Sequence, residues 1–352
     1  MIKVKAYATH GSKELLIPFS FERRNCRLTD VQIEILYCGV CHSDLHHVKN
    51  EWKNTIYPLV PGHEIVGRVV HVGDKVKQFN IGDIVGVGCL IDSCRSCPSC
   101  RDHLEQYCEK GLITTYNSLD KYDHEVTYGG YSSQIIVDEK FVLHIPKTFK
   151  ESDLVQVAPL LCAGITTYSP LKHWKVAPGS LVGIIGLGGL GHMAVKIAHA
   201  MGAFVVVFTS SQEKIADAIH FGANAAFLAN DPEGLTTYYN KLDFILETSS
   251  APYTLATYLE LLKRDGVMCL VGLPSAPSEM FEAFSLIKKR ASIVGSLIGG
   301  LQETQEMLDF CAKHQILSTV EVIPIQQINE AYKKMEKRAV KYRFVIDMAT
   351  LH

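Results

Sequence analysis

The hydrophobic positions in the first 90 residues follow the short period of β-strands. Segments 31–40 and 63–73 carry β-branched, partly alternating side chains, and segment 74–88 has a turn–strand–turn order. Proline and glycine residues interrupt these runs, as they do between strands. Residues 132–146 have the same character and predict a further strand pair. We therefore predict an antiparallel, barrel-like β fold for this part of the chain.

The period changes at Ser180. Residues 180–185 form an apolar run that leads into a glycine-rich turn and then into a helical pattern. Short apolar runs then alternate with amphipathic segments as far as residues 267–272. This alternation is typical of βαβ units and predicts a doubly wound parallel sheet in an α/β domain. Two helical patterns follow, and we expect the last apolar strand, at 342–348, to pair back into the N-terminal β fold.

Length and composition limit the classes of protein. A chain of 352 residues favours two domains, and 47% hydrophobic with 20% charged residues allow a sizeable buried core. The formal net charge of −2 gives no electrostatic reason to expect nucleic acid or a membrane as partner. No apolar stretch has the length of a signal peptide core or a membrane span, so we expect a soluble, cytoplasmic protein.

Cysteine spacing indicates a structural metal site. The chain has 11 cysteines, and four of them stand at the spacing C-x2-C-x2-C-x7-C, namely Cys94, Cys97, Cys100 and Cys108. Four thiolates that converge on one tetrahedral ion leave no open position, which predicts a structural zinc site. An iron–sulfur cluster would use the same ligands, and cysteines without metal are a further alternative. A nucleic-acid zinc ribbon is disfavoured because the flanks lack clustered Lys and Arg.

A second metal site is indicated between residues 38 and 64. Cys41 and His63 are ligands of the kind that Zn²⁺ prefers, and a catalytic zinc takes three protein ligands and keeps a fourth position open. Cys162, at the start of a predicted helix, is the candidate third ligand. A cysteine in an apolar setting is more often a small buried side chain. We adopt that interpretation for the remaining five, which are Cys26, Cys38, Cys89, Cys269 and Cys311.

The glycine-rich turn predicts a dinucleotide site. Gly186, Gly188 and Gly191 form G-x-G-x-x-G between a predicted strand and a predicted helix, where glycines permit a tight turn and close approach of a pyrophosphate. The second strand ends in residues 209–211, Thr-Ser-Ser, with Lys214 one turn later. Hydroxyl groups and a cation suit a 2′-phosphate, so we predict NADP(H). The alternative for Ser210 or Ser211 is a plain helix N-cap.

Several motifs together resemble one family. Segments 39–48, 57–73, 158–168, 183–198 and 208–214, with the four-cysteine motif, are similar to the zinc-dependent medium-chain alcohol dehydrogenases, and most similar to the cinnamyl alcohol dehydrogenase branch. The resemblance covers nearly the whole chain in order. It implies a GroES-like catalytic domain of residues 1–158 and 297–352, with a structural zinc lobe at about 89–112. It also implies a Rossmann domain of residues 159–296.

The resemblance also implies roles for single residues. Cys41, His63 and Cys162 match the catalytic zinc ligands, and Glu64 matches an acidic residue that approaches the metal when the ligand set exchanges. Ser43 matches a hydroxyl that hydrogen-bonds the substrate oxygen. The remaining matches are His46 at the outer end of the proton relay, Asp44 as the carboxylate that orients the ligand histidine, and Trp52 as the aromatic of the substrate pocket. The neighbouring His42 is either part of this chemistry or a space-filling side chain.

The expected cofactor contacts lie in three parts of the Rossmann domain. They are Gly186, Leu187, Gly188, Gly189, Leu190, Gly191, Thr209, Ser210, Ser211, Lys214 and Gly295. Lys341 and Arg343 are either further contacts with a cofactor phosphate or ordinary surface cations. We expect a homodimer joined through the Rossmann sheets, with residues 291–296 beside 267–272 as its edge.

The resulting hypothesis is an enzyme that uses two zinc ions per chain and NADP(H) to interconvert primary alcohols and aldehydes. Aromatic, allylic and aliphatic substrates all remain open, and NADP(H) favours aldehyde reduction as the direction in a cell. A zinc-binding reductase of the same superfamily with another carbonyl substrate is one alternative. A zinc-free quinone or enoyl reductase is disfavoured because such enzymes lack these metal ligands, and a non-catalytic zinc scaffold would have no use for an open metal site.

Overall fold

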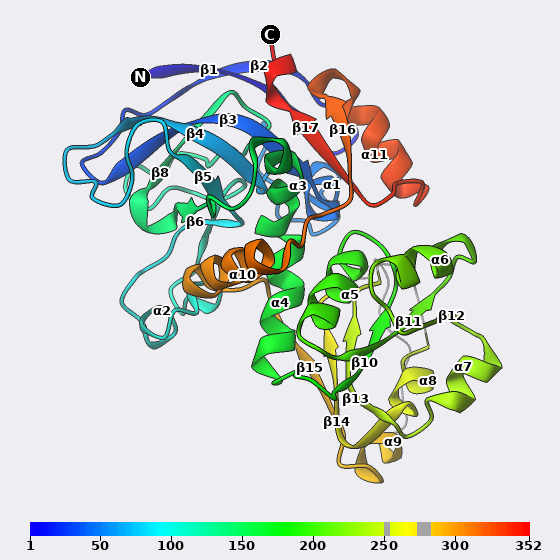
Figure 1. Cartoon of the computed structure of the whole chain (residues 1–352). Coiled ribbons are helices and arrows are strands. Elements are labelled where there is room, and N and C mark those ends of the chain that lie inside the picture. Colours follow the sequence, from blue (N-terminus) through cyan, green and yellow to red (C-terminus); the bar gives the residue numbers. More distant parts are fainter. Residues whose placement is uncertain (250–253, 273–282) are drawn as a thin grey trace. The chain divides into compact units, whose positions relative to one another are not determined.

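The computed structural model describes residues 1–249, 254–272 and 283–352. The chain forms two compact units (Figure 1), of residues Met1–Cys162 with Gly299–His352, and of residues Ala163–Ile298. The first unit thus contains both ends of the chain. Residues Ala158–Leu161 form a 3₁₀ turn (η4) against β3, β4 and β5 of the first unit, which is why the unit extends past the expected boundary at residue 158.

One sheet organises the first unit. Its strand order is β16-β17-β3-β4-β5-β9, and β8 also pairs with β3. The strands are β3 (Asp30–Val40), β4 (Ile65–Val72), β5 (Ile84–Val87), β8 (Gln134–Asp138), β9 (Leu143–His144), β16 (Val320–Pro324) and β17 (Arg343–Asp347). All pairs are antiparallel except β16 with β17. The antiparallel sheet expected from the strand-like period is confirmed.

The long strand β3 is the centre of this sheet. Its first half pairs with β8, and its second half pairs with β17, where Phe344 lies opposite Val40. The expected return of the C-terminal strand to the N-terminal fold is therefore confirmed. The expected pairing within residues 132–146 is wrong. Both strands form, but β8 pairs with β3 and β9 with β5, because the 3₁₀ turn Glu139–Phe141 (η2) carries the chain across to the next strand position.

Shorter elements complete the first unit. They are β1 (Ile2–Ala8) paired with β2 (Ile17–Arg23), β6 (Leu90–Asp92) paired with β7 (Ile113–Thr114), α1 (His42–Val48), α2 (Pro98–Arg101), η1 (Glu105–Tyr107), η3 (Glu151–Asp153), α3 (Leu154–Val157), α10 (Leu301–His314), η5 (Ile325–Gln327), α11 (Ile328–Glu336) and η6 (Met348–Thr350). The helix α1 follows β3 directly, so residues 38–48 run from the buried strand into the helix that carries several predicted site residues.

The second unit is a parallel sheet with helices between its strands. The strand order is β12-β11-β10-β13-β14-β15, and each neighbouring pair is parallel. The strands are β10 (Leu181–Ile185), β11 (Phe204–Thr209), β12 (Ala225–Leu228), β13 (Leu242–Glu247), β14 (Leu262–Leu270) and β15 (Ser292–Gly295). The helices are α4 (Ala163–His173), α5 (Gly191–Ala200), α6 (Glu213–His220), α7 (Pro232–Thr237), α8 (Leu255–Leu259) and α9 (Phe284–Ile287).

The strand order of the second unit indicates where a ligand is expected to bind. The central strands β10, β11 and β13 are almost wholly buried, as strands covered on both faces are. The order reverses between β10 and β13, since the chain first adds strands on one side and then on the other. Ligands of such sheets bind outside the carboxyl ends of the strands at this reversal. The predicted doubly wound fold is confirmed.

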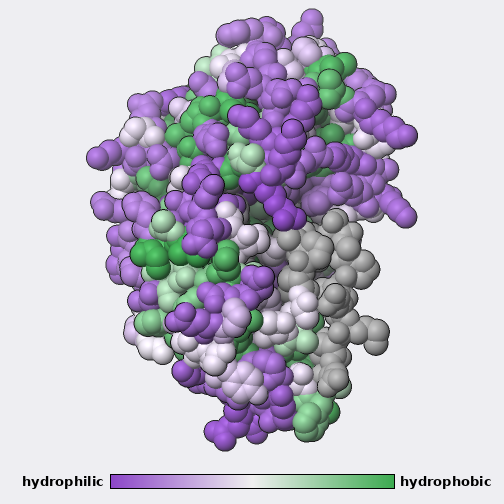
Figure 2. Space-filling model, turned by 90° about the vertical axis from the view of Figure 1, so that its right-hand side faces the viewer, coloured by the Kyte–Doolittle hydropathy of each residue, from purple (hydrophilic) through white to green (hydrophobic). Residues whose placement is uncertain are grey.

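The surface is mixed in character. Figure 2 shows hydrophilic residues over much of one face, with hydrophobic residues gathered in separate patches. Within the described residues, no single helix is both long and apolar enough to cross a membrane. One bent pair, Glu151–Leu161 with Ala163–His173, meets the criteria of length and composition alone.

Candidate active site and metal centres

Cys41 lies at the junction of β3 and α1. It is the N-cap of α1 in an extended conformation, and the Asp44 carboxylate accepts a hydrogen bond from its backbone N–H at 2.9 Å. This reciprocal contact resembles a capping box, in which the third helical residue reaches back to the cap. The local sequence Cys-His-Ser-Asp therefore fixes the orientation of the Cys41 thiol at the start of the helix.

His63 is oriented by the same carboxylate. Oδ1 of Asp44 accepts hydrogen bonds from His63 Nδ1 at 3.0 Å and from Gly62 N–H at 3.2 Å. Gly62 has φ +104°, and a Cβ there would lie 2.8 Å from Cys38 Sγ, so only glycine suits the turn before His63. With Nδ1 engaged, Nε2 is left free to bind a metal. Burial opposes a charge on this ring, but Asp44 raises the pKa of His63 well above its ordinary value.

Cys162, which is distant from Cys41 and His63 in the sequence, lies next to Cys41 in the structure. It follows the 3₁₀ turn η4, and its Sγ lies 3.9 Å from Cys41 Sγ. The hydrogen bond from Cys162 holds the pKa of the Cys41 thiol well below its usual range. One ligand atom each from Cys41, His63, Glu64 and Cys162 lies within 4.8 Å of the others, and all four residues are buried. The structure thus brings together the residues predicted for the second metal site.

Glu64 is a buried carboxylate with one free oxygen. It is fully buried, and its Oε1 forms an ion pair with Arg343. Oε2 has no hydrogen-bond partner among the described residues and lies where a Cβ on Gly39 would collide with it. Burial raises the pKa of Glu64 to about 7, although Arg343 opposes this. An orphaned buried oxygen beside two thiols and an imidazole fits an approaching metal ion.

Arg343 is not the surface residue considered from the sequence. It lies on β17, is only 4% exposed, and its guanidinium pairs with Glu64 in the first unit. The charge of Glu64 raises the pKa of Arg343 above its usual range against the effect of burial. The interpretation of Arg343 as an ordinary surface cation is therefore wrong, because the strand pairing of β17 with β3 carries it to the metal site.

The remaining site residues of the first unit gather along α1. The Ser43 hydroxyl lies 3.7 Å from Cys41 Sγ, and His46 Nδ1 lies 2.5 Å from a carboxylate oxygen of Glu51. The ring of Trp52 lies 5.1 Å from that of His46. His42, with its ring 6.4 Å from that of His46, has its pKa lowered by burial.

The structure adds residues that the sequence reasoning missed. Besides Glu51, these are His47, whose ring meets Trp52 edge-on at 4.6 Å, and Tyr116, whose ring lies 5.3 Å from His47 and 5.8 Å from His63. Together they form an aromatic wall next to the metal site. His47 adjoins His46 and could have been chosen from the sequence, but nothing in the spacing of Tyr116 connects it with residues 42–63.

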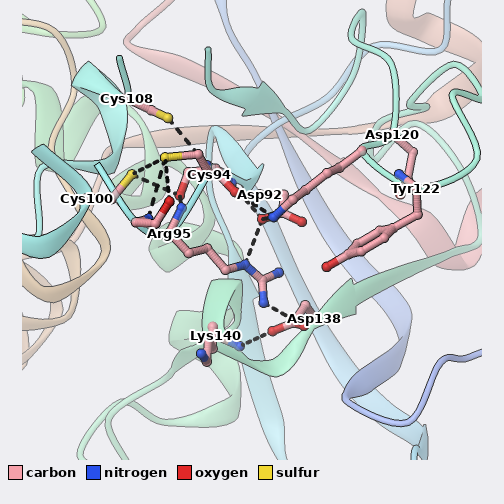
Figure 3. Close-up of polar contacts among 12 residues, drawn as sticks. Asp92, Cys94, Arg95, Cys100, Cys108, Asp120, Tyr122, Asp138 and Lys140 are labelled. Carbon is pink, nitrogen blue, oxygen red and sulfur yellow. Dashed lines mark hydrogen bonds and ion pairs between the residues drawn. The ribbon is translucent and has the colours of Figure 1, made fainter. Parts of the chain in front are cut away.

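The four-cysteine motif forms a second cluster (Figure 3). Its ligand atoms also lie within 4.8 Å of one another, and Cys94 Sγ lies 3.9 Å from Cys100 Sγ. The backbone N–H groups of Ser96 and Cys97 donate to Cys94 Sγ at 3.5 and 3.3 Å, and they lower the pKa of the Cys94 thiol to about 5. The loop thus favours the thiolate that a metal requires.

Charged side chains attach this cysteine lobe to the rest of the first unit. Figure 3 shows the Arg95 guanidinium between two carboxylates, with Nε 2.8 Å from Asp92 and one terminal nitrogen 3.0 Å from Asp138 at the end of β8. Elsewhere in the lobe, Glu105 accepts a hydrogen bond from Leu301 N–H at 3.0 Å, at the start of α10. The lobe is therefore connected to a sheet strand and to a helix.

The glycine turn lies between β10 and α5 in the second unit. Gly186 has φ +88°, and a Cβ on Gly191 would lie 2.1 Å from the Gly186 carbonyl oxygen. Gly188 faces open space. These are the three functions of a dinucleotide fingerprint: a tight turn, an open approach for phosphate, and close packing of helix on strand. Between them Leu187 is buried, and Gly189 and Leu190 are half-buried.

The other predicted cofactor residues are placed in two groups. Thr209 ends β11 and is buried, Ser210 is exposed, and Lys214 lies in the first turn of α6. Gln212 before α6 has helical φ and ψ, and the Ser211 carbonyl accepts the Lys214 N–H, so the alternative role of Ser211 as a helix cap stays open. Gly295 ends β15, which β13 and β14 separate from β10. Its contact with cofactor stays a prediction.

The chain is similar to known families and proteins over most of its length. Residues 27–147 match the alcohol dehydrogenase GroES-like domain, and residues 189–313 match the zinc-binding dehydrogenase domain. The chain is 53% identical over 350 residues to aldehyde reductase YahK of Escherichia coli (strain K12), covering 99% of each protein. The chain belongs to the zinc-binding medium-chain alcohol dehydrogenases. The resemblance noted in the sequence is thereby confirmed.

Solved structures show the same relationship for this alcohol dehydrogenase. The cinnamyl alcohol dehydrogenase SbCAD4 from Sorghum bicolor matches with a TM-score of 0.95 at 41% identity, covering 100% of this chain and 99% of the other. A Helicobacter pylori CAD complexed with NADP(H) matches with a TM-score of 0.93 at 44% identity, with the same coverage. The expected GroES-like and Rossmann architecture is confirmed.

The donor sets of this alcohol dehydrogenase fit two zinc ions. Four thiols suit a closed structural site, whereas two thiols and an imidazole with a nearby carboxylate suit a catalytic site that keeps a position open. The second-site histidine also has its non-ligating nitrogen on a carboxylate, as metal-binding histidines almost always do.

A further buried carboxyl group lies in the Rossmann unit. Glu247 ends β13 next to the reversal of strand order, and it is only 1% exposed. One carboxylate oxygen accepts the Ser249 N–H at 2.6 Å, while Oε2 has no hydrogen-bond partner in the described part of the chain. Burial raises the pKa of Glu247 to about 7. The folded enzyme therefore holds this proton more tightly than the unfolded chain does.

This difference predicts a pH-dependent stability. A raised carboxyl pKa favours folding fully below the unfolded value, and the benefit is lost as pH rises through about 7. Glu247→Gln removes the ionisation. As pH rises from about 5 to 8, its free energy of unfolding should therefore increase relative to that of the parent enzyme by on the order of 2–3 kcal/mol, and its melting temperature should increase accordingly. Thermal unfolding at each pH measures it.

Glu233→Gln, at an exposed glutamate of the same unit, is the control and should show a constant offset. A Glu247→Gln offset that is likewise constant from pH 5 to 8 would contradict the prediction.

Proposed function

We propose that this enzyme interconverts primary alcohols and aldehydes with NADP(H), and that aldehyde reduction is its direction in the cell. The observation that carries the proposal is the buried cluster of Cys41, His63 and Cys162 with the free oxygen of Glu64 beside it. A purely structural zinc site has no need of an exchangeable fourth group, whereas a site that takes up and releases an oxygen ligand does. When bound there, zinc supplies Lewis acidity to the substrate oxygen, and NADP(H) supplies or accepts the hydride.

The protein's own residues then manage the proton. Ser43, whose hydroxyl lies 3.7 Å from a ligand thiol, is placed to hydrogen-bond the substrate oxygen. His46 is the outer group of the relay. The contact of its Nδ1 with Glu51 leaves Nε2 to exchange a proton with solvent. Glu64 stays paired with Arg343 and offers its second oxygen to the metal position while one oxygen ligand leaves and the next one binds.

Aromatic and allylic aldehydes are the proposed substrate class. Trp52, His47 and Tyr116 provide a wall of rings next to the ligand His63, and aromatic faces pack well against planar conjugated molecules. The names of the similar proteins, an aldehyde reductase and a cinnamyl alcohol dehydrogenase, agree with this class. Another carbonyl substrate for the same zinc chemistry is the second candidate.

NADP(H) is proposed for this chain from the end of β11. Thr209, Ser210 and Ser211 stand where a carboxylate would select NAD, and Lys214 follows in the first turn of α6. The similar H. pylori enzyme was solved with NADP(H).

Assembly and location are part of the proposal. The outermost strand β15 offers its edge to a second copy, which supports a homodimer. None of the 11 cysteines, all of which lie among the described residues, forms a disulfide, which supports a reducing, cytoplasmic location. Sedimentation at micromolar concentration should give the mass of two chains, and a single-chain mass would refute the dimer.

The function is tested by metal content together with NADPH oxidation over a panel of aldehydes, beginning with cinnamaldehyde and benzaldehyde. The parent enzyme should hold two zinc ions and turn over aromatic aldehydes. Cys162→Ala should lose one zinc and at least about a thousandfold of kcat, because three ligands hold the catalytic ion. Cys311→Ala, at a buried cysteine on α10, is the control and should keep both ions.

Three outcomes would count against parts of the proposal. Full activity of Cys162→Ala with two zinc ions would refute the ligand assignment. Turnover only on other carbonyls would refute the aromatic class and favour the second candidate. One zinc ion and no turnover in the parent would refute the catalytic function.

Cofactor choice gives a separate prediction. Ser210→Asp places a carboxylate where the 2′-phosphate is expected, and the two anions repel each other. The ratio of kcat/KM for NADPH to that for NADH should fall about tenfold or more, measured with one aldehyde at saturation. Thr237→Asp adds the same charge at an exposed position of α7 and should leave the ratio unchanged. Equal losses with both cofactors in Ser210→Asp would contradict the assignment.

A further inference from the structure

Asp44 is a fully buried carboxylate that depends on hydrogen-bond donors. Oδ2 accepts from Cys41 N–H at 2.9 Å and from the Tyr131 hydroxyl at 3.3 Å, while Oδ1 accepts from Gly62 N–H and His63 Nδ1. Burying an ionised carboxylate is costly unless such donors surround it. Two of these donors belong to the metal ligands themselves, so any movement of Asp44 moves the metal site.

The Tyr131 hydroxyl is the first member of a longer chain. Tyr332 donates its hydroxyl hydrogen to the Tyr131 oxygen at 3.4 Å, and Tyr131 donates to Asp44. Both rings are buried, and burial raises the pKa of each hydroxyl well above its ordinary value, so both remain donors. Tyr332 lies on α11, so the hydroxyl chain connects the C-terminal helix with the carboxylate that orients His63.

The backbone holds Tyr131 firmly in this position. Its N–H donates to the Pro61 carbonyl, and its own carbonyl accepts from Tyr7 N–H, both at 2.9 Å. A Cβ on Gly129 would lie 2.4 Å from the Gly62 carbonyl oxygen, so the loop lies directly against the chain that leads into His63. The hydroxyl is therefore presented to Asp44 by a rigid support, as a positioning group requires.

We propose that Tyr131 and Tyr332 are positioning residues for the catalytic metal. The chain of hydroxyls from Tyr332 through Tyr131 fixes the rotation of the Asp44 carboxylate, and the carboxylate in turn fixes His63 and the backbone of Cys41. Polar chains of this kind strengthen each member by polarising the next. The inference rests on the proposed metal role of Cys41, His63 and Cys162. Among the residues that the structure describes, these hydroxyl groups hydrogen-bond each other and Asp44 but no member of that cluster, so they act through Asp44.

Tyr131→Phe and Tyr332→Phe test the proposal, since each removes one hydroxyl and keeps the ring. The measurements are zinc affinity of each site by chelator competition, the visible spectrum of the enzyme with Co²⁺ in the catalytic site, and kcat and KM separately. Tyr131→Phe should lower zinc affinity at the catalytic site about tenfold, the lower end for groups that support metal ligands. The four-cysteine site should be unaffected.

The cobalt spectrum of Tyr131→Phe should change because the ligand geometry changes, and kcat should fall while KM for NADPH holds. Tyr332→Phe should act in the same direction by about two- to threefold, because it is one bond further from the carboxylate. The double variant should resemble Tyr131→Phe, since the chain is already broken at its first member.

Tyr57→Phe is the matched control. It also loses one tyrosine hydroxyl, which bonds the Val48 carbonyl at the end of α1, but it does not join Asp44. It should leave zinc affinity and the cobalt spectrum unchanged. Changes of equal size in Tyr57→Phe would mean that any lost hydroxyl near α1 has this effect, and they would overturn the proposal.

Unchanged affinity and spectrum in folded Tyr131→Phe would also overturn it. Should Tyr131→Phe fail to fold, Tyr332→Phe decides alone, and an unchanged affinity and spectrum there refute the chain. These readouts do not require turnover. A parent enzyme that binds two metals but reduces no aldehyde would therefore refute the proposed function. The present inference would still be decided by the metal affinities and the cobalt spectra.

Discussion

The catalytic end of this molecule depends on one buried carboxylate. Asp44 joins the backbone of Cys41, the turn at Gly62, the ring of His63 and the hydroxyl of Tyr131, and it is fully removed from water. A buried charge of this kind is stable only when each surrounding donor stays in place. The requirement works in both directions, because the same hydrogen bonds that stabilise Asp44 fix the direction of the two proposed metal ligands Cys41 and His63.

Glu64 is a second buried carboxylate, but unlike Asp44 it is not fully hydrogen-bonded. Glu64 has one oxygen on Arg343 and one without a partner among the described residues, so its site is incompletely satisfied. Structures rarely leave a buried oxygen in that state without a use. Next to two thiols and an imidazole, the use consistent with zinc-binding alcohol dehydrogenase chemistry is a reserve ligand. In the proposed mechanism, Asp44 gives the site rigidity, and Glu64 gives it the capacity to change coordination.

The cysteine lobe shows how a segment with little regular structure becomes a fixed part of a domain. Its helices are a single turn of α2 and a 3₁₀ turn, too short to be stable alone. Four thiols converge on one point, Arg95 connects the lobe to Asp138 at the end of β8, and Glu105 receives the first N–H of α10. A bound metal therefore stabilises the loop and, through Arg95 and Glu105, its attachment to the end of β8 and to the start of α10.

The sequence by itself determined the features that depend on neighbours in the chain. Strand and helix periods, the cysteine spacing, the glycine turn and the ligand types all follow from local geometry, and the structure agrees with them. Tertiary structure decided the features that join distant segments. It paired β8 and β9 with different strands, placed Arg343 on Glu64, and brought Tyr116, Tyr131 and Tyr332 to residues 42–63. The reason is physical: a residue pattern shows which face of an element is buried, but only the packed sheet determines which distant side chain meets it.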